Sequence, residues 1–279
     1  MYKILSKEYL NNTVARISVQ APYIAQKAKA GQFVILRSCE NSARIPFTIA
    51  RADTNTGSID IIYQIVGGGT LELDSLSVGD SLNALVGPLG NPTEIEGINY
   101  ACVVGGGVGT AIALPIAEAL YKQGTKVDSI IGFRNKELII LEDEFRSISD
   151  NLYVLTDDGS YGVKGFVTNG LEDNILSGKT YDRVFAIGPL PMMKFVSLLT
   201  KEHNIPTTVS MNSIMVDGTG MCGGCRLTVG GKIRFACIDG PDFDGHQVDF
   251  DEAISRSKMF RESEIKSREF ACNLYKKEI

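Results

Sequence analysis

The stretch Val103-Val104-Gly105-Gly106-Gly107-Val108-Gly109-Thr110 decides how the middle of this chain folds. An apolar strand enters a glycine turn, and Thr110 then suits the N-cap of a helix. A strand, a glycine turn and a helix in this order place a helix N-terminus against a pyrophosphate. The next strand, residues 127–133, ends without the acidic residue of the standard dinucleotide fingerprint. This departure weakens the case for a conventional dehydrogenase.

The surrounding residues extend this pattern into an α/β domain, which we expect over residues 98–211. Predicted strands and helices alternate there, and one of the helices is expected over residues 137–148. Such alternation is typical of a parallel sheet with helices on both faces. The turn Ile187-Gly188-Pro189 follows a later strand, where ligands of open α/β sheets bind, although proline also simply ends strands.

Two polar positions follow other strands of this domain. Arg134 lies close to where the 2′-phosphate of NADP would bind, but a solvated arginine fits equally well. Asp157 and Asp158 open a loop that continues with Gly159 and Ser160. A turn with a helix cap explains these acids more simply than metal binding or acid–base work.

Residues 1–97 form short β-branched runs separated by Gly, Asn and Asp, which favours an antiparallel β-barrel. The stretch Arg44-Ile45-Pro46-Phe47-Thr48 falls between two runs, and its arginine offers a fixed fork of donors to a phosphate. Farther along, Ile62-Tyr63-Gln64 leads into Gly67-Gly68-Gly69-Thr70, where bare N–H groups can cradle a phosphate. Each stretch alone also fits an ordinary loop; together they predict a phosphate-containing ligand.

Three of the six cysteines, Cys222, Cys225 and Cys237, gather in a glycine-rich segment that begins at Asp217. A C-x2-C pair with a third thiol is metal-ligand spacing, and Asp217 stands where an iron–sulfur protein of this spacing usually has a cysteine. The residues alone leave a [2Fe–2S] cluster, a structural zinc ion, and free thiols or a disulfide as alternatives. We expect a small cluster domain over residues 212–250.

Composition excludes several classes of function. A net charge of −5 makes nucleic acid an unexpected partner, and the 44% hydrophobic content is that of an ordinary globular protein. We expect no signal peptide and no membrane span, and a cytoplasmic location. Residues 251–279 form a charged helical tail whose apolar face is too narrow for a coiled coil. We expect this tail to pack on the chain's own domains or against a partner.

The ordered series of motifs resembles the ferredoxin-reductase-like electron-transfer flavoproteins, over about residues 1–250. Within them it resembles the electron-transfer subunits of dihydroorotate dehydrogenases and the small subunits of NADH-dependent ferredoxin:NADP+ oxidoreductases. The resemblance implies FAD on the barrel, NAD(H) on the α/β domain and a [2Fe–2S] cluster beyond it. Dihydroorotate subunits have a cysteine where this chain has Asp217, which favours the second group, where an aspartate at this place is similar.

The resemblance also assigns the residues of each site. It implies that FAD is contacted by Arg44, Ile45, Pro46, Phe47, Thr48, Ile62, Tyr63, Gln64, Gly68, Gly69 and Thr70. It implies that the nicotinamide nucleotide is contacted by Gly105, Gly106, Gly107, Val108, Gly109, Thr110, Arg134, Asp158, Gly188 and Pro189. It implies that the cluster is bound by Asp217, Cys222, Cys225 and Cys237.

The function implied is electron transfer from NADH through FAD to the cluster. Nicotinamide gives up a hydride, a cluster takes one electron, and a flavin can do both, so no side-chain acid, base or nucleophile is assigned. The electrons would pass to a larger flavin or iron–sulfur subunit, in a heterodimer that bifurcates electrons. An electron-transfer subunit of a dihydroorotate dehydrogenase is the alternative, and a zinc-stapled nucleotide-binding regulatory module is a more distant one.

Overall fold

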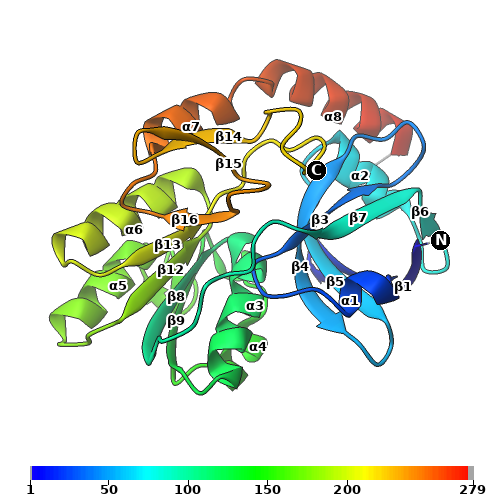
Figure 1. The fold of residues 1–279 in the computed structure, drawn as a ribbon. Coiled ribbons are helices and arrows are strands. Elements are labelled where there is room, and N and C mark those ends of the chain that lie inside the picture. The colour runs from blue at the N-terminus through cyan, green and yellow to red at the C-terminus, as the bar shows by residue number, and fades with distance from the viewer. Residues whose placement is uncertain (1, 276–279) are drawn as a thin grey trace.

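The computed structural model describes residues 2–275 and contains two seven-stranded sheets that a C-terminal extension bridges (Figure 1). Position 1 and positions 276–279, which belong to the predicted barrel domain and tail, lie outside the described residues. No helix within residues 2–275 is long and apolar enough to cross a membrane. The predicted antiparallel barrel followed by a parallel sheet is confirmed.

The first sheet is the barrel, and neighbouring strands run in the order β6-β1-β2-β5-β4-β3-β7 with antiparallel pairing. Its elements are β1 (Tyr2–Asn11), β2 (Val14–Gln20), α1 (Pro22–Ala25), β3 (Phe33–Arg37), β4 (Ile45–Asp53), β5 (Ser58–Gln64), α2 (Gly68–Ser75), β6 (Ser81–Leu82) and β7 (Ala84–Leu89). Alternate side chains of β5, such as Ile59 and Ile61, fill the barrel interior. Ile62 points the other way and packs with the helix that follows β8.

The second sheet has the order β11-β10-β9-β8-β12-β13-β16, and all its pairs are parallel except β13 with β16. Its strands are β8 (Tyr100–Gly106), β9 (Lys126–Phe133), β10 (Asn151–Thr156), β11 (Val163–Lys164), β12 (Arg183–Ile187), β13 (Thr207–Ser210) and β16 (Asp242–Asp244). The helices between them are α3 (Gly109–Lys122), η1 (Lys136–Leu138), α4 (Glu142–Ile148), α5 (Val167–Leu176) and α6 (Leu190–Glu202). The edge strand β16 comes from the cysteine-rich segment.

The helices cover both faces of this sheet, as the alternation predicted. Along β8, Ala101 and Val103 pack with α3 and α4, whereas Cys102 and Val104 pack with α5 and α6. This period of two follows from the pleat, which sends successive side chains to opposite faces. A strand buried on both sides needs an unbroken apolar run, which explains the sequence of residues 101–104.

Two local predictions were wrong. The helix expected over residues 137–148 is broken, because Leu141 has φ +62° and separates η1 from α4. Ile140 and Leu141, the two residues at this break, are both buried in the core between α3 and α4. Thr110 is not an N-cap either, because α3 begins one residue before it and Val108 holds the cap position.

A buried carboxylate links the amino ends of three neighbouring strands, β8, β9 and β10. Asp128 is fully buried and accepts hydrogen bonds from the Tyr100 and Tyr181 hydroxyls at 2.8 and 2.9 Å. The Asn151 amide donates to it at 2.8 Å, and the Lys179 ammonium lies 2.5 Å away. Burial by itself raises the pKa of Asp128, but these hydrogen bonds outweigh it, so the pKa lies below its ordinary value.

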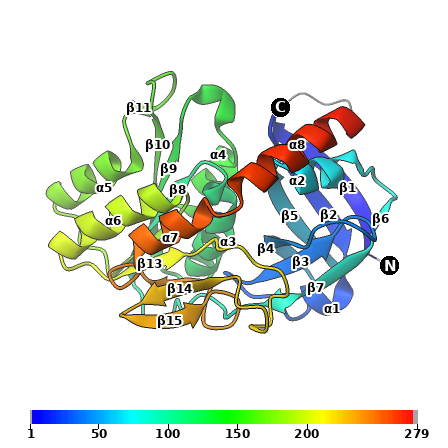
Figure 2. The ribbon, with the colours of Figure 1, turned by 90° about the horizontal axis from the view of Figure 1, so that it is seen from above.

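The C-terminal extension runs from the α/β domain back to the barrel. It comprises β14 (Arg226–Val229), β15 (Lys232–Phe235), α7 (Phe250–Ser257) and α8 (Arg261–Tyr275). Figure 2 shows α7 beside α6 and α8 lying over α2. Ala271 is only 5% exposed and belongs to the barrel core, with Cys272 and Tyr275 packed against it. The tail therefore packs on the chain's own domains.

Candidate functional site

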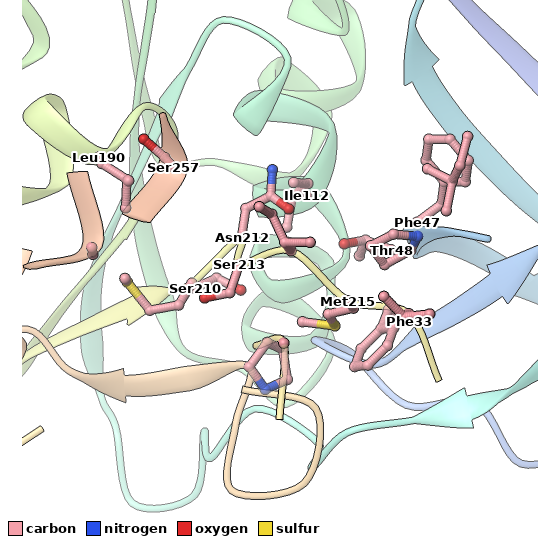
Figure 3. Close-up of a pocket in the computed structure, with 18 of the residues that line it drawn as sticks. Phe33, Phe47, Thr48, Ile112, Leu190, Ser210, Asn212, Ser213, Met215 and Ser257 are labelled. Carbon is pink, nitrogen blue, oxygen red and sulfur yellow. The ribbon is translucent and has the colours of Figure 1, made fainter. Parts of the chain in front are cut away.

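A cavity of about 720 Å³ opens where the barrel, the loop after β13 and the C-terminal extension meet. Figure 3 shows Phe47 and Thr48 of β4 on one side of it, Ser257 of α7 on the other, and Asn212 and Ser213 between them. Eight of the eleven residues assigned to FAD line this cavity: Arg44, Ile45, Pro46, Phe47, Thr48, Ile62, Tyr63 and Gln64. Its volume lies within the range of roughly 300–1,000 Å³ that ligand pockets occupy.

The eight residues contribute differently. Arg44 is exposed at the start of β4, so its guanidinium is accessible to a phosphate. Tyr63 is 1% exposed, and its hydroxyl donates to Asp74 at 3.5 Å inside the barrel. Burial, followed by the nearby Asp74 charge, raises the pKa of Tyr63. The hydroxyl of Tyr63 therefore belongs to the barrel core.

The glycine turn before α2 adjoins this cavity, and Val66 just before the turn is part of its wall. The Thr70 hydroxyl accepts hydrogen bonds from the backbone N–H groups of Val66 and Gly67, both at 3.0 Å, so it shapes the turn. A Cβ added at Gly69 would lie 2.5 Å from the Ile45 side chain. A side chain at this position would displace the end of the Ile45 side chain, so glycine lets β4 lie close to the start of α2.

A second cavity of about 830 Å³ lies at the carboxyl edge of the parallel strands. The chain moves from β8 outward to β10 and then returns to β12 on the other side of β8, so this edge is a topological switch point. Seven of the ten residues assigned to the nicotinamide nucleotide line this cavity: Gly106, Gly107, Val108, Gly109, Arg134, Gly188 and Pro189.

The glycines of this edge allow a close approach that fits a dinucleotide. A Cβ at Gly109 would lie 2.6 Å from Gly188 Cα, so α3 begins directly against the Ile187–Gly188 turn. Gly107 has φ +55° and faces open space, where a pyrophosphate can meet the N-terminus of α3. Thr110 is fully buried behind this turn, and its Oγ1 has no hydrogen-bond partner within residues 2–275.

Asp157 rather than Asp158 forms part of the cavity wall. Asp158 accepts a hydrogen bond from the Ser160 N–H at 2.9 Å and so stabilises its own loop, as a turn would predict. Hydrogen bonds from Ser160 also lower the pKa of Asp158. Asp157 directly follows β10. The resemblance assigned Asp158 and not Asp157 to the nucleotide, although the position of Asp157 at a strand end was the signal that could have identified it.

The two cavities share one wall. Five residues from four different segments line both of them: Gln64, Val108, Ile112, Ser210 and Asn212. Ser210 and Asn212 lie at and just after the end of β13 and carried no motif in the sequence. The two cavities are therefore adjacent, so a ligand in the first would lie close to a ligand in the second, and direct hydride transfer requires such proximity.

The cysteine loop lies beside the first cavity, and Cys222 is part of the cavity wall. Cys225 and Cys237 are buried with their Sγ atoms 3.2 Å apart, whereas Cys222 is exposed. Asp217 accepts hydrogen bonds from the backbone N–H groups of Thr219 at 3.0 Å and Cys222 at 2.9 Å, and the first of these is the main reason that its pKa is lowered.

The loop fits an iron–sulfur centre in its chemistry. It offers three thiols and a carboxylate, and Gly218, Gly220 and Gly223 all have positive φ, which lets the backbone turn around the sulfur atoms. Two of the four groups, Cys225 and Cys237, already meet. Within residues 2–275, no three His, Cys, Asp or Glu side chains are arranged as a complete metal site.

Comparisons with known proteins agree on one family. Residues 212–249 match the iron–sulfur cluster binding domain of dihydroorotate dehydrogenase B. Over 262 residues the chain is 44% identical to a homologue of the dihydroorotate dehydrogenase B (NAD(+)) electron transfer subunit from Thermotoga maritima, covering 94% of this chain and 92% of the relative. It is 32% identical over 249 residues to that electron transfer subunit from Streptococcus pneumoniae, covering 86% of this chain and 94% of the relative.

A solved structure of an NADH-dependent reduced ferredoxin-NADP oxidoreductase, described for flavin-based electron bifurcation, contains a chain of the same fold. It is 43% identical with a TM-score of 0.92, covering 96% of this chain and 97% of that one. The chain therefore belongs to the family of dihydroorotate dehydrogenase B electron transfer subunits and their homologues, which are NAD(H)-dependent oxidoreductase subunits with FAD and an iron–sulfur cluster.

Proposed function

We propose that this chain is the small subunit of a bifurcating NADH-dependent ferredoxin:NADP+ oxidoreductase. It oxidises NADH at the second cavity, and electrons leave through the cysteine loop to a larger flavin or iron–sulfur subunit. The observation that carries this proposal is the wall shared by the two cavities, since it places two ligands next to each other. When bound, FAD accepts a hydride and releases electrons singly.

The chain's own residues position the reactants. Arg44 and the N-terminus of α2 hold the phosphates of the ligand in the first cavity. The turn at Gly107 and the N-terminus of α3 hold the pyrophosphate of NADH, with Gly188 close behind. Gln64 and Asn212 in the shared wall exclude water from the meeting point of the two rings. Asp217, Cys222, Cys225 and Cys237 hold a [2Fe–2S] cluster beside the same cavity.

The partner and the location belong to the proposal. The likeness to proteins named as electron transfer subunits supports a heterodimer with a larger subunit. Six free cysteines, one of them the exposed Cys39, suit a reducing cytoplasm. The iron–sulfur family match supports an iron–sulfur centre over the zinc-stapled module.

A dihydroorotate dehydrogenase subunit is the second candidate, because several relatives carry that name. Copurification with the native partner under anaerobic conditions distinguishes the two. We expect FAD, at least two iron atoms per small subunit, and reduction of NADP+ that requires both NADH and reduced ferredoxin as electron donors. Reduction of NAD+ by dihydroorotate in that complex would favour the second candidate, and a complex without flavin would exclude both.

We expect NADH to reduce the bound flavin at least about tenfold more efficiently than NADPH. Arg134 can attract a 2′-phosphate, but Asp157 in the same wall repels it. Stopped-flow bleaching of the flavin absorbance with each nucleotide measures the ratio. Asp157→Asn should lower the ratio of flavin reduction by NADH to flavin reduction by NADPH. Asp158→Asn, outside the cavity, should leave this ratio unchanged. Equal or better reduction by NADPH in the wild type would contradict the assignment.

Arg44→Ala should weaken FAD binding about tenfold to hundredfold, because it removes a charge-assisted hydrogen bond worth roughly 1.5–3 kcal/mol. Titration of apo-protein with FAD, followed by quenching of flavin fluorescence, gives the dissociation constant. Arg51→Ala is the matched control, since Arg51 lies on β4, which directly follows Arg44, and pairs with Glu118. An unchanged affinity for Arg44→Ala would show that Arg44 is only a surface residue.

A further inference from the structure

The junction of α7 and α8 forms part of the wall of the first cavity. We call residues 256–260 the elbow; Arg256, Ser257, Met259 and Phe260 line the same cavity as the FAD-assigned residues of β4 and β5. The elbow follows those strands by about 200 positions in the sequence, and no motif marks it. Figure 3 shows Ser257 facing the cavity from the side opposite Phe47 and Thr48.

The elbow is held at both ends. On its α7 side, the Lys194 ammonium of α6 lies 2.7 Å from Asp251, and the Glu252 carboxylate accepts a hydrogen bond from the Thr228 N–H at 3.0 Å. On its α8 side, Ser267 lies so close to the start of α2 that a Cβ at Gly68 would be 2.9 Å from its carbonyl oxygen. The elbow therefore connects the part of the chain that packs on the α/β domain with the part that packs on the barrel (Figure 2).

The side chains of the elbow have hydrogen-bond donors and apolar surface that the chain itself does not fully use. Arg256 carries five N–H donors and places one of them on the Gly224 carbonyl oxygen, at 3.3 Å. Met259 and Phe260 line the cavity yet remain 57% and 50% exposed. A half-exposed aromatic ring on a cavity wall gains most from a planar ring laid against it. A cation beside an apolar surface is the combination that suits a flavin dinucleotide, which has phosphates and two ring systems.

We propose that the elbow is part of the FAD site and fastens the tail over the bound dinucleotide. Arg256 donates a charge-assisted hydrogen bond to an acceptor of FAD, and Phe260 with Met259 covers one of its ring faces. FAD is the occupant because the facing wall carries Arg44 and the other FAD-assigned residues of β4 and β5. The inference rests on the proposed function only in that it takes FAD as the ligand of this cavity.

Matched pairs of variants test the contact in the full chain. Phe260→Ala should raise the dissociation constant of FAD at least about tenfold, whereas Phe270→Ala, a 69% exposed residue of α8 away from the cavity, should change it less than twofold. Arg256→Met should weaken binding about tenfold to hundredfold, and Arg261→Met, which does not line the cavity, less than twofold. Thermal unfolding of each apo-protein shows that the variants fold.

Tryptic cleavage of the wild type gives a readout that needs no substitution, because Arg256 and Lys258 place two trypsin sites in the elbow. Saturating FAD should slow cleavage at these sites at least about fivefold, and Phe260→Ala should lose most of this protection. Equal FAD affinity in all four variants, or cleavage of the elbow unaffected by FAD that does bind, would overturn the proposal. Wild-type protein that binds no FAD would instead overturn the proposed function.

Discussion

Asp128→Ala is expected to lower the free energy of unfolding by about 3 kcal/mol, a large fraction of the stability of a typical domain. The substitution leaves the Lys179 ammonium without its counter-charge. It also leaves the Tyr100 and Tyr181 hydroxyls without their acceptor. Breaking a buried ion pair costs roughly 3–5 kcal/mol, and the lower figure applies because the Lys179 side chain is 22% exposed and can regain water.

Urea unfolding monitored by circular dichroism measures this loss. Asp173→Ala, an exposed aspartate on α5, is the control and should change stability by less than about 0.5 kcal/mol. Adding Lys179→Met to Asp128→Ala should recover part of the lost free energy of unfolding, because the unpaired Lys179 charge is then removed. A loss below about 1 kcal/mol for Asp128→Ala would show that the network contributes little.

The same network predicts an acid dependence. The pKa of Asp128 is lower in the folded chain than its ordinary value of 3.8, so the folded state favours the ionised carboxylate. Its contribution to stability is fully present above pH 3.8 and is lost as the pH falls through the folded pKa. Asp128→Asn should therefore flatten the acid limb of a plot of unfolding free energy against pH below about 4.

Asp217→Ala is expected to make the cluster labile, so that anaerobically purified protein holds less than about half of the iron of the wild type. Asp217→Cys should keep the cluster and lower its reduction potential, because thiolate donates more electron density than carboxylate. The neutral histidines of Rieske centres raise the potential by roughly several hundred millivolts. Asp217 retains the negative charge of a thiolate, so we expect a smaller difference between Asp217→Cys and the wild type.

The competing explanation is that Asp217 only shapes the loop, since it accepts hydrogen bonds from Thr219 and Cys222. Asp239→Ala is the control, because Asp239 caps the neighbouring turn by accepting the Phe235 N–H at 2.7 Å and is no candidate ligand. Iron content and electron paramagnetic resonance spectra compare the variants. Equal loss of iron in Asp239→Ala and Asp217→Ala, with an unchanged potential in Asp217→Cys, would favour loop capping.

Local patterns in the sequence were sufficient for the architecture, and the family resemblance assigned most of the residues of both cavities. The glycines from Gly105 to Gly109 predict a strand, a turn and a helix because only glycine permits the close approach that such a turn needs. The apolar run from Ala101 to Val104 predicts a strand covered on both faces for the same local reason. Seven residues that the resemblance assigned to the nucleotide and eight that it assigned to the flavin line the two cavities.

Only the tertiary structure decided which of two adjacent acids, Asp157 or Asp158, belongs to a cavity, because a strand end determines the direction in which each side chain points. Two contacts between residues far apart in the chain are also seen only in the tertiary structure. Asp128 pairs with Lys179, and Ser267 packs against Gly68. Such contacts depend on how whole elements pack, and no local spacing encodes them. The elbow lines the first cavity for this reason, since α8 docks on α2 through the buried Ala271.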